Sequence, residues 1–316
     1  MTEAAAVAAY TGNGAYCFSN GLHMSLLAAG AEPLRLPEPG FLECLSGMAF
    51  GRLYNVQRPV FFPSAPGWSP EEHGLERAID ALGWRCEVWC DGCDADEALD
   101  RLRRGLAQGP VLLGPLDFGY LSHFRGSGAM AGFDHYVVGL GLTDDGLVLH
   151  DPAGIPYAVL PLADLLPAWR ADRIGYKRAP YTLRTTFQRV AMPSRQAMIE
   201  RAWPLVRDCI RDLADGPRHF GGHRALSRLA AAMRTAVPEP LEKHLLGFSL
   251  PTAARRSVDA ARFLAEADRP DAARLMRDEA VLWGLACSLA ARGDWPRAAE
   301  AVDRLAAIDR EVASTL

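Results

Sequence analysis

Cys17 lies between a glycine-rich segment and an apolar run. Gly12 and Gly14 precede it, and the run from Leu22 to Ala29 leads to Gly30. This order predicts a turn followed by a helix that ends near Gly30, with the thiol at the helix N-terminus. Unpaired N–H groups and the helix macrodipole favour a thiolate at that place. Cys17 is therefore the candidate nucleophile.

Two residues far along the chain can activate such a thiol. Residues 133–151 contain two β-rich runs joined by an Asp-Asp-Gly turn, which predicts an antiparallel hairpin. His135 lies near the start of the first strand and Asp151 at the end of the second, so pairing brings these two ends side by side. A cysteine nucleophile needs a base that takes its proton and an acid that fixes the tautomer of the base. We predict a Cys17, His135 and Asp151 triad; Asp134 is the competing acid, but its side chain should point to the opposite face from that of its neighbour.

The alternative to a triad is an unrelated core thiol and a sheet histidine, because free cysteines are among the most often buried residues. Acyl chemistry would also require donors for an oxyanion, and the backbone N–H of Cys17 is the natural first one. Asn13 and Asn55 are the two candidates for the second donor, although asparagine at a turn often serves its own backbone. Asp117 and Tyr120 follow a short buried run and are candidates for substrate contact at the cleft mouth.

A metal site is not expected. Cys90 and Cys93 form a Cys-Asp-Gly-Cys motif, with Cys86 upstream on the same predicted strand. A second pair of cysteines or histidines at zinc-site spacing does not follow. We therefore predict no metal ligand set.

The composition is that of an ordinary globular protein. Of the 316 residues, 49% are hydrophobic and 23% charged, and the net charge of −4 argues against nucleic-acid binding. The N-terminal residues lack an export signal, and no apolar run reaches the length of a membrane span. The 7 cysteines, an odd number at irregular spacings, fit reduced thiols. We expect a cytoplasmic protein without membrane contact.

The chain is predicted to form two domains. Residues 1–190 alternate helical and strand patterns, which predicts an α+β domain with an antiparallel sheet and the nucleophile helix packed on it. Within them, the aromatic and proline-rich residues 41–68 either line an acyl pocket or form a loop-rich layer of core. Residues 191–316 carry five alanine-rich amphipathic segments, which predicts an all-α helical domain. Such helices also make a homodimer plausible.

Three motifs together resemble one family. They are Gly14-Ala15-Tyr16-Cys17 at a helix start, Gly114-Pro115-Leu116-Asp117 with Tyr120-Leu121, and Asp134-His135-Tyr136-Val137-Val138-Gly139 followed by His150-Asp151-Pro152. They look like the N-terminal domain of butirosin-biosynthesis protein H and its relatives, and the helical region resembles the C-terminal extension of that family. The resemblance implies a papain-like fold. A counterpart to the side-chain oxyanion donor that papain-like enzymes supply upstream of the cysteine is not recognisable here.

The resemblance also implies an activity. The chain would be an acyltransferase that takes an acyl or aminoacyl group from the phosphopantetheine thioester of an acyl or peptidyl carrier protein, holds it on Cys17, and makes an amide on a small-molecule amine in bacterial natural-product biosynthesis. His135 would relay protons and Asp151 would hold His135. The protein would need no cofactor of its own, since the carrier protein supplies the phosphopantetheine. A cysteine peptidase, amidase or thioesterase using water, and a non-catalytic scaffold with a buried Cys17, are the alternatives.

A carrier protein is acidic, so the implied partner predicts a basic patch beside the cleft. Arg173, Lys177 and Arg178 lie close together in the sequence, and Arg184 and Arg189 follow them. We predict that the first three dock the carrier protein; the alternative is a solvated edge of the domain.

Overall fold

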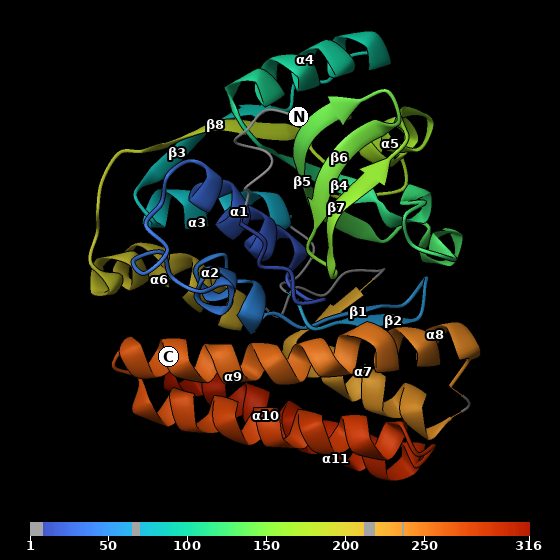
Figure 1. Ribbon diagram of the computed structural model, residues 1–316. Coiled ribbons are helices and arrows are strands. Elements are labelled where there is room, and N and C mark those ends of the chain that lie inside the picture. The colour runs from blue at the N-terminus through green and yellow to red at the C-terminus, as the bar shows by residue number, and fades with distance from the viewer. Residues whose placement is uncertain (1–8, 65–69, 212–218, 236) are drawn as a thin grey trace. The chain divides into compact units, whose positions relative to one another are not determined.

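Figure 1 shows the computed structural model, which describes residues 9–64, 70–211, 219–235 and 237–316. The chain divides into two compact units, and neither is a single stretch of sequence. The first contains Met1–Pro39 and Leu82–Met192, and the second contains Gly40–Ala81 and Pro193–Leu316.

The first unit is built on a six-stranded antiparallel sheet with the order β3-β8-β4-β5-β6-β7. Its strands are β3 (Trp84–Trp89), β4 (Val111–Asp117), β5 (Asp134–Thr143), β6 (Gly146–Asp151), β7 (Ile155–Leu160) and β8 (Leu183–Arg189). Its helices are α1 (Cys17–Ala28), α4 (Ala95–Gln108) and α5 (Leu162–Arg170), with the short 3-10 turns η3 (Phe118–Tyr120) and η4 (Ser127–Met130). The sheet is therefore the frame that positions everything in this unit.

Helix α1 packs directly on the centre of the sheet, against β4, β5 and β6. Nine of its twelve residues are buried, from Phe18 to Leu26. A glycine in the middle of the helix permits this contact, because a Cβ on Gly21 would come within 2.7 Å of Leu112 Cδ1. The close approach fixes α1, and with it the residue at its N-terminus, relative to the strands.

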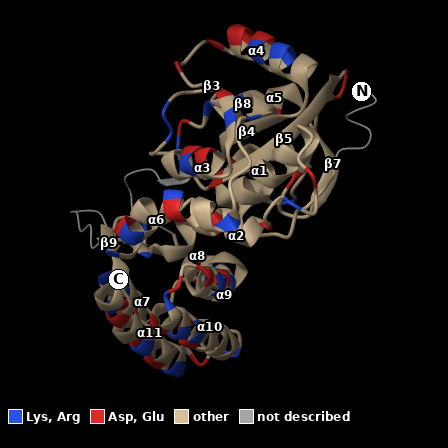
Figure 2. Cartoon of the chain, turned by 90° about the vertical axis from the view of Figure 1, so that its left-hand side faces the viewer, with Lys and Arg blue, Asp and Glu red and all other residues tan. Residues whose placement is uncertain are grey.

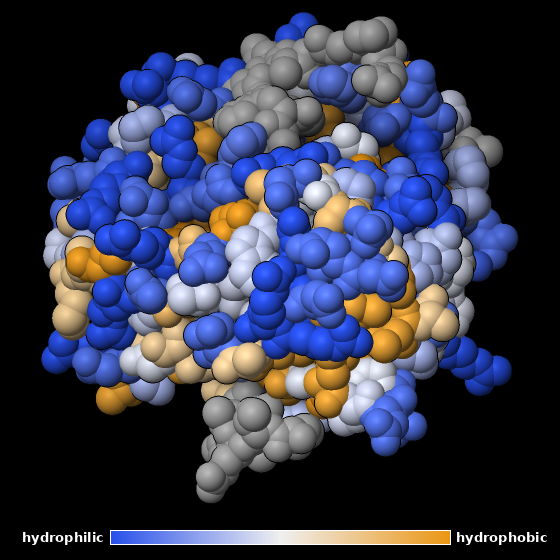
Figure 3. Space-filling view, turned by 90° about the horizontal axis from the view of Figure 1, so that it is seen from above, coloured by the Kyte–Doolittle hydropathy of each residue, from blue (hydrophilic) through white to orange (hydrophobic). Residues whose placement is uncertain are grey.

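The other large helices of the unit share one apolar core with the sheet. The leading members of this core come from α4, α5 and strands β4, β5 and β6: Ala98, Leu102, Leu113, Val137, Leu149 and Trp169. Asp94 caps α4 by accepting a hydrogen bond from the N–H of Glu97 at 2.9 Å. Figure 3 shows that the face seen from above is mostly hydrophilic, with separate small hydrophobic patches.

The second unit is mainly helical. Its helices are α2 (Pro39–Leu45), α3 (Pro70–Ala81), α6 (Arg195–Arg211), α7 (Gly222–Arg234), α8 (Glu239–His244), α9 (Leu250–Glu266), α10 (Pro270–Ala290) and α11 (Trp295–Thr315), with the 3-10 turn η2 (Met48–Phe50) and the π-helical turn η5 (Leu245–Ser249). Strands β1 (Leu53–Asn55), β2 (Val60–Phe62) and β9 (His219–Gly221) form a small antiparallel sheet with the order β2-β1-β9. Charges of both signs are interspersed along α10 and α11 (Figure 2).

The predicted α+β class with an antiparallel sheet and a helical C-terminal region is confirmed. The C-terminal region is not purely helical, however, because β9 pairs with β1 from a distant part of the chain. The structure also differs from the predicted ranges 1–190 and 191–316, since Gly40–Ala81 packs with the second unit. Phe61, for instance, stacks on Trp283 of α10 at 5.7 Å between ring centroids, so these aromatic residues form core.

A buried ion pair holds the early segment of the second unit to its long helices. Arg256 on α9 donates to Glu43 on α2 at 2.8 Å and 2.5 Å, and also to the carbonyl of Pro63. The two side chains are 4% and 0% exposed.

Among the residues that the structure describes, no helix combines the length and the apolar character needed to cross a membrane.

Removing one partner of this pair should be costly, because it leaves the other charge buried without compensation. We expect Arg256→Met to lower the free energy of unfolding by about 3–5 kcal/mol. The matched control, Arg274→Met, breaks an ion pair with Asp278 in which both side chains are 54% exposed, and should cost about 1 kcal/mol or less. Urea unfolding followed by tryptophan fluorescence measures both, and equal effects would contradict the assignment of the buried pair.

Candidate active site

The Cys17 thiol lies at the first residue of α1, on a partly exposed side chain. The residue before it, Tyr16, is buried and has left-handed backbone angles of φ 58° and ψ 50°. Asn20, one turn into the helix, donates from Nδ2 to the carbonyls of Ala15 at 2.7 Å and Tyr16 at 3.1 Å. A strained bend held in this way presents a side chain and an N–H group in one fixed direction.

The turn before Cys17 is tied to the end of β6. The N–H groups of Asn13 and Gly14 donate to the carbonyl of Pro152 at 3.0 Å and 3.1 Å. The Tyr10 hydroxyl donates to the carbonyl of Asp151 at 2.7 Å. Gly12 leaves room for these bonds, because a Cβ there would lie 1.8 Å from the Tyr10 oxygen and 2.9 Å from the carbonyl of Pro152. These bonds join the segment that carries the thiol to the strand end that carries the acid.

Cys17, His135 and Asp151 are linked by consecutive hydrogen bonds. His135 Nε2 lies 2.8 Å from Asp151 Oδ1, and the side chain of His135 is hydrogen-bonded to Cys17. Because Asp151 takes Nε2, the ring nitrogen that remains for the thiol is Nδ1. Burial alone lowers the pKa of His135, but the charge of Asp151 and the hydrogen bonds to Asp151 and Cys17 outweigh it and raise the pKa to about 10. The imidazole is therefore a strong base in contact with the thiol.

The Asp151 carboxylate is fully buried and receives three donors. Oδ1 accepts from His135 and, at 2.8 Å, from the N–H of Ala153, whereas Oδ2 lies 2.8 Å from Nε2 of His123. Burial raises the pKa of Asp151, but the charge of His135 and the hydrogen bonds from His123, His135 and Ala153 outweigh it and hold the pKa well below its usual range. An ionised carboxylate accepts hydrogen bonds only, so each of these three groups is a donor.

His123 was missed in the sequence. It follows η3 in an irregular segment with no hydrophobic period, and nothing in the sequence relates it to Asp151, which lies 28 residues on. Aromatic rings surround the two histidines: Phe118 lies 5.0 Å from His135 between ring centroids, and Phe124 lies 4.7 Å from His123. These rings cover the imidazoles and separate them from water.

Asp134, the competing acid, and Asn13, one candidate for the second oxyanion donor, are both hydrogen-bonded to other residues. Asp134 accepts a hydrogen bond from the Tyr176 hydroxyl at 2.9 Å. The Asn13 carboxamide accepts from the N–H of Ala15 at 3.1 Å and exchanges hydrogen bonds with Asn20 at 3.1 Å and 3.3 Å. Asn13 thus lies four residues before Cys17 and braces the turn, while its function as an oxyanion donor stays a prediction.

Asn55 belongs to another part of the molecule. It is the last residue of β1 in the second unit, whereas Cys17, His135 and Asp151 all lie in the first. Its Oδ1 accepts from the N–H groups of Gln57 and Arg58, both at 3.0 Å. Its side chain therefore closes the turn that leads from β1 to β2, while its function as an oxyanion donor stays a prediction.

Asp117 and Tyr120 meet a residue that was predicted for docking. The buried Asp117 carboxylate accepts from the N–H groups of Gly119 and Gly132, both at 2.9 Å, and pairs with Arg173 Nε at 2.9 Å. The Arg173 guanidinium also lies over the Tyr120 ring, 4.9 Å from its centroid. These three residues line a cavity of about 260 Å³ together with Pro167, Arg170, Asp172 and Tyr181.

The remaining basic residues are not equivalent. Lys177 is only 18% exposed and donates to Asp172 at 3.1 Å and to the carbonyl of Arg170 at 2.7 Å. Arg178 is exposed and lies 3.1 Å from the Cys90 sulfur. Arg184 is fully buried on β8, so it cannot contribute to an exposed docking patch. Of the sequence cluster, Arg173 lines the cavity of about 260 Å³.

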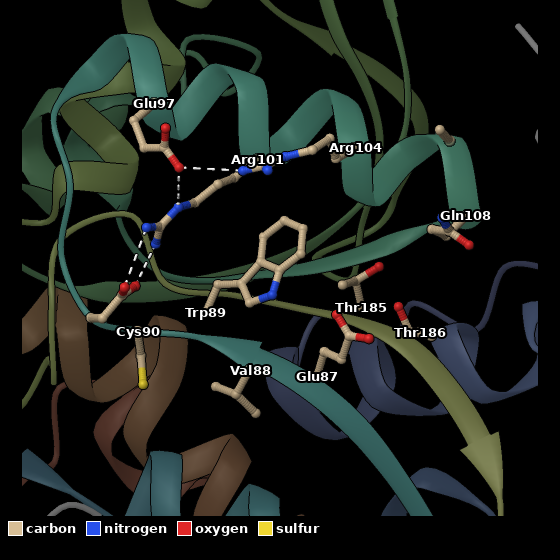
Figure 4. Close-up of a pocket in the computed structure, with 12 residues that line it drawn as sticks. Glu87, Val88, Trp89, Cys90, Glu97, Arg101, Arg104, Gln108, Thr185 and Thr186 are labelled. Atoms are coloured by element: carbon tan, nitrogen blue, oxygen red, sulfur yellow. Dashed lines mark hydrogen bonds and ion pairs between the residues drawn. The ribbon is translucent and has the colours of Figure 1, made fainter.

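A second cavity, of about 750 Å³, lies elsewhere in the first unit (Figure 4). Its lining comes from α4, β3 and β8, with Trp89 in its middle and Arg104 5.5 Å from the centre of that ring. Arg101 crosses its wall between Asp91 and Glu97. Neither this cavity nor the smaller one is lined by Cys17, His135 or Asp151. Over the described ranges, no three histidine, cysteine or acidic side chains are grouped so as to hold a metal ion.

Comparisons with known proteins show two likenesses. A family model described as the YobF C-terminal domain matches residues 215–316. Over 302 residues the chain is 28% identical to the uncharacterized protein YobF of Bacillus subtilis (strain 168), and this similarity covers 95% of each chain. The likeness to that protein therefore extends over both units.

The raised pKa of His135 predicts a pH dependence of stability. A histidine whose pKa is above 6.5 in the folded state keeps a proton that the unfolded chain loses, so stability falls as pH rises above about 6.5. Cys17→Ala is the proper background, because it removes the titration of the thiol. There we expect the free energy of unfolding to decline by up to about 1.4 kcal/mol per pH unit for one proton.

The matched comparison is Cys17→Ala with His135→Gln, which cannot take up that proton. Thermal unfolding between pH 6 and 9 should show a smaller decline in the double variant. Parallel declines in the two proteins would contradict the ion pair between His135 and Asp151.

Proposed function

We propose that the protein is a cysteine-dependent acyltransferase with a papain-like catalytic domain. It would take an acyl or aminoacyl group from an acyl or peptidyl carrier protein thioester and transfer it, through a Cys17 acyl-enzyme, to an amine in bacterial natural-product biosynthesis. The observation that carries the proposal is the chain of hydrogen bonds from Cys17 through His135 to the buried Asp151. The arrangement of an antiparallel sheet with α1 packed on it and the thiol at the helix start supports the papain-like assignment.

In the first half-reaction, the Cys17 sulfur attacks the carbonyl carbon of the donor thioester. The bond between that carbon and the donor sulfur breaks, and His135 gives its proton to the leaving thiolate. Exchange of one thioester for another is nearly isoenergetic, so this step needs no nucleotide. The backbone N–H of Cys17 at the start of α1 is placed to stabilise the developing oxyanion.

In the second half-reaction, the amine attacks the acyl-enzyme. His135 takes the proton of the amine, the carbon–nitrogen bond forms, and the Cys17 sulfur leaves as a thiolate. Asp151 keeps the imidazole in one orientation through both steps and stabilises its protonated form. The product is an amide, linear or cyclic according to the acceptor.

The exposure of Cys17 bears on the non-catalytic alternative. A scaffold without catalytic function predicts a buried, unreactive cysteine, whereas Cys17 is partly exposed and contacts a base. Hydrolysis by the same triad remains the competing activity, and it differs from transfer only in the acceptor of the acyl group.

Recognition of the donor would fall to the cavity of Asp117 and Arg173. Arg170 and Arg173 line it with side chains 60% and 45% exposed, and each has its Nε bound to a carboxylate, Asp172 at 3.1 Å and Asp117 at 2.9 Å. A guanidinium held through Nε keeps its two terminal NH₂ groups for an anion. We assign this cavity to the phosphate of the phosphopantetheine arm.

Intact-mass spectrometry tests the acyl-enzyme. The wild-type protein, incubated with an acyl-phosphopantetheine thioester, should gain the mass of the acyl group, and an added amine should discharge it. Cys17→Ala should show no gain. His135→Gln, the control for the base, should acylate at least about a hundredfold more slowly, as general-base catalysis contributes on that order. Discharge by water at the same rate with and without amine would favour the hydrolase.

A second experiment tests the donor site. Acyl-phosphopantetheine should acylate Cys17 at roughly tenfold lower concentration than acyl-pantetheine, which lacks the phosphate, because charge-assisted hydrogen bonds to one anion are lost. Arg170→Gln should remove most of this preference. Arg103→Gln, an exposed arginine paired with Asp100 on α4, should retain it. Equal use of the two donors by the wild type would reject this cavity as the phosphate site and leave the acyl-enzyme untouched.

A further inference from the structure

We propose that His123 is a positioning residue of the site: its Nε2–H holds one oxygen of Asp151 so that the other stays directed at His135. The two imidazole nitrogens lie at the same distance from the carboxylate, 2.8 Å, on different oxygens. His123 would thus be a fourth member of the site that touches no reacting atom.

The direction of the hydrogen bond fixes the tautomer of His123. Asp151 is ionised and can only accept, so Nε2 must carry the proton. The other ring nitrogen, Nδ1, is buried and has no hydrogen-bond partner within the described part of the chain. The ring is therefore oriented by Asp151 alone among polar groups, and its side chain is only 7% exposed.

The need for this second donor follows from the burial of Asp151. Its side chain is 0% exposed, so water cannot replace a lost partner. Oδ1 has two donors, His135 and the N–H of Ala153, whereas the donor on Oδ2 is His123. Without His123, one oxygen of a buried charge lacks its donor, which is costly. The carboxylate can relieve that cost only by turning about its side-chain bonds, and turning weakens the bond to His135.

The backbone at Asp151 is held in place and cannot shift to restore the lost hydrogen bond. The carbonyl of Asp151 accepts from Tyr10 at 2.7 Å, and the next carbonyl, that of Pro152, accepts from Asn13 and Gly14. The adjustment therefore falls on the carboxylate itself. His123 is held equally firmly from its own side.

The segment that carries His123 is braced before and after it. The N–H of Phe124 donates to the carbonyl of Leu121 at 2.9 Å, and the Ser122 hydroxyl donates to Asp164 on α5 at 2.6 Å. The Phe118 and Phe124 rings pack 5.1 Å apart between centroids. A histidine fixed in this way is pre-organised for Asp151, which is what a positioning role requires.

The test measures the reactivity of Cys17 toward iodoacetamide between pH 5 and 9, with peptide mapping to separate it from the other cysteines. This readout rests on the proposed nucleophile but needs no acyl donor. His123→Leu removes the donor, and we expect it to slow alkylation at neutral pH at least about tenfold, the loss expected for one charged hydrogen bond. It should also move the midpoint of the pH profile toward that of an ordinary thiol, about 8.5.

His123→Gln is the rescue variant, because its amide N–H reaches the place of Nε2 and should keep the alkylation rate within about threefold of the wild type. His244→Leu is the matched control, a buried histidine of the second unit whose Nε2 donates to the carbonyl of Phe61 at 3.1 Å. It should leave the pH profile unchanged. A wild-type profile in His123→Leu, or equal losses in the Leu and Gln variants, would overturn the positioning role.

A direct measurement covers the case in which His123→Leu does not fold. Nitrogen-15 NMR of histidine-labelled wild-type protein should show His123 protonated at Nε2, and a proton on Nδ1 alone would overturn the proposal. An ordinary thiol profile for Cys17 in the wild type is a different result: it would remove the nucleophile, and with it both the proposed function and this role. An activated wild-type profile that His123→Leu leaves unaltered would reject the role of His123 alone.

Discussion

A carboxylate with no exposed surface is the constraint around which the first unit is arranged. Taking a charge out of water costs several kcal/mol unless hydrogen bonds replace the water. Asp151 meets this cost with donors from three places in the chain: the strand of His135, the segment of His123, and the backbone N–H of Ala153. Each donor connects a different segment of the chain to the end of β6. The hydrogen bonds that stabilise the buried charge therefore also bring the residues of the site together.

The thiol reaches this point by a second set of contacts that does not involve the carboxylate. Gly21 lets α1 lie against Leu112 of the sheet, and the turn before Cys17 is bonded to the carbonyl of Pro152. The packing of α1 on the sheet sets the distance between the helix and the strands. The turn before Cys17 sets the position of Cys17, the first residue of α1. Because the two sets act on opposite sides of Cys17, the thiol has little freedom relative to His135 even though its side chain is partly exposed.

The local elements of this arrangement, such as the hairpin, could be predicted from the sequence. The contacts between segments that are far apart in the chain could not. The hairpin was readable because its two runs are rich in β-forming residues and its turn is Asp-Asp-Gly. In the structure Val138 pairs with His150, and the register shifts between Gly139 and Gly141, so His135 reaches Asp151 diagonally. Strand β8 was missed because Leu183-Arg184-Thr185-Thr186 does not read as a buried strand, yet the structure buries Arg184 completely. The packing of Gly40–Ala81 with the C-terminal helices depends on long-range pairs such as Glu43 with Arg256, for which the sequence carries no local signal.

The distribution of exposure across the site bears on the choice between transfer and hydrolysis. Cys17 is partly open, whereas His135 is 5% exposed and Asp151 is 0% exposed, and aromatic rings from Phe118 and Phe124 stand beside the base. In the proposed reaction, an acceptor would give its proton to His135 from the position that the donor thiol has left. Water is small enough to enter there but gains nothing from the apolar rings, whereas an amine carried on a larger molecule can bury surface as it arrives. A base covered in this way favours an acceptor that binds over one that merely diffuses in, and this supports the proposed transfer to an amine over the competing hydrolysis.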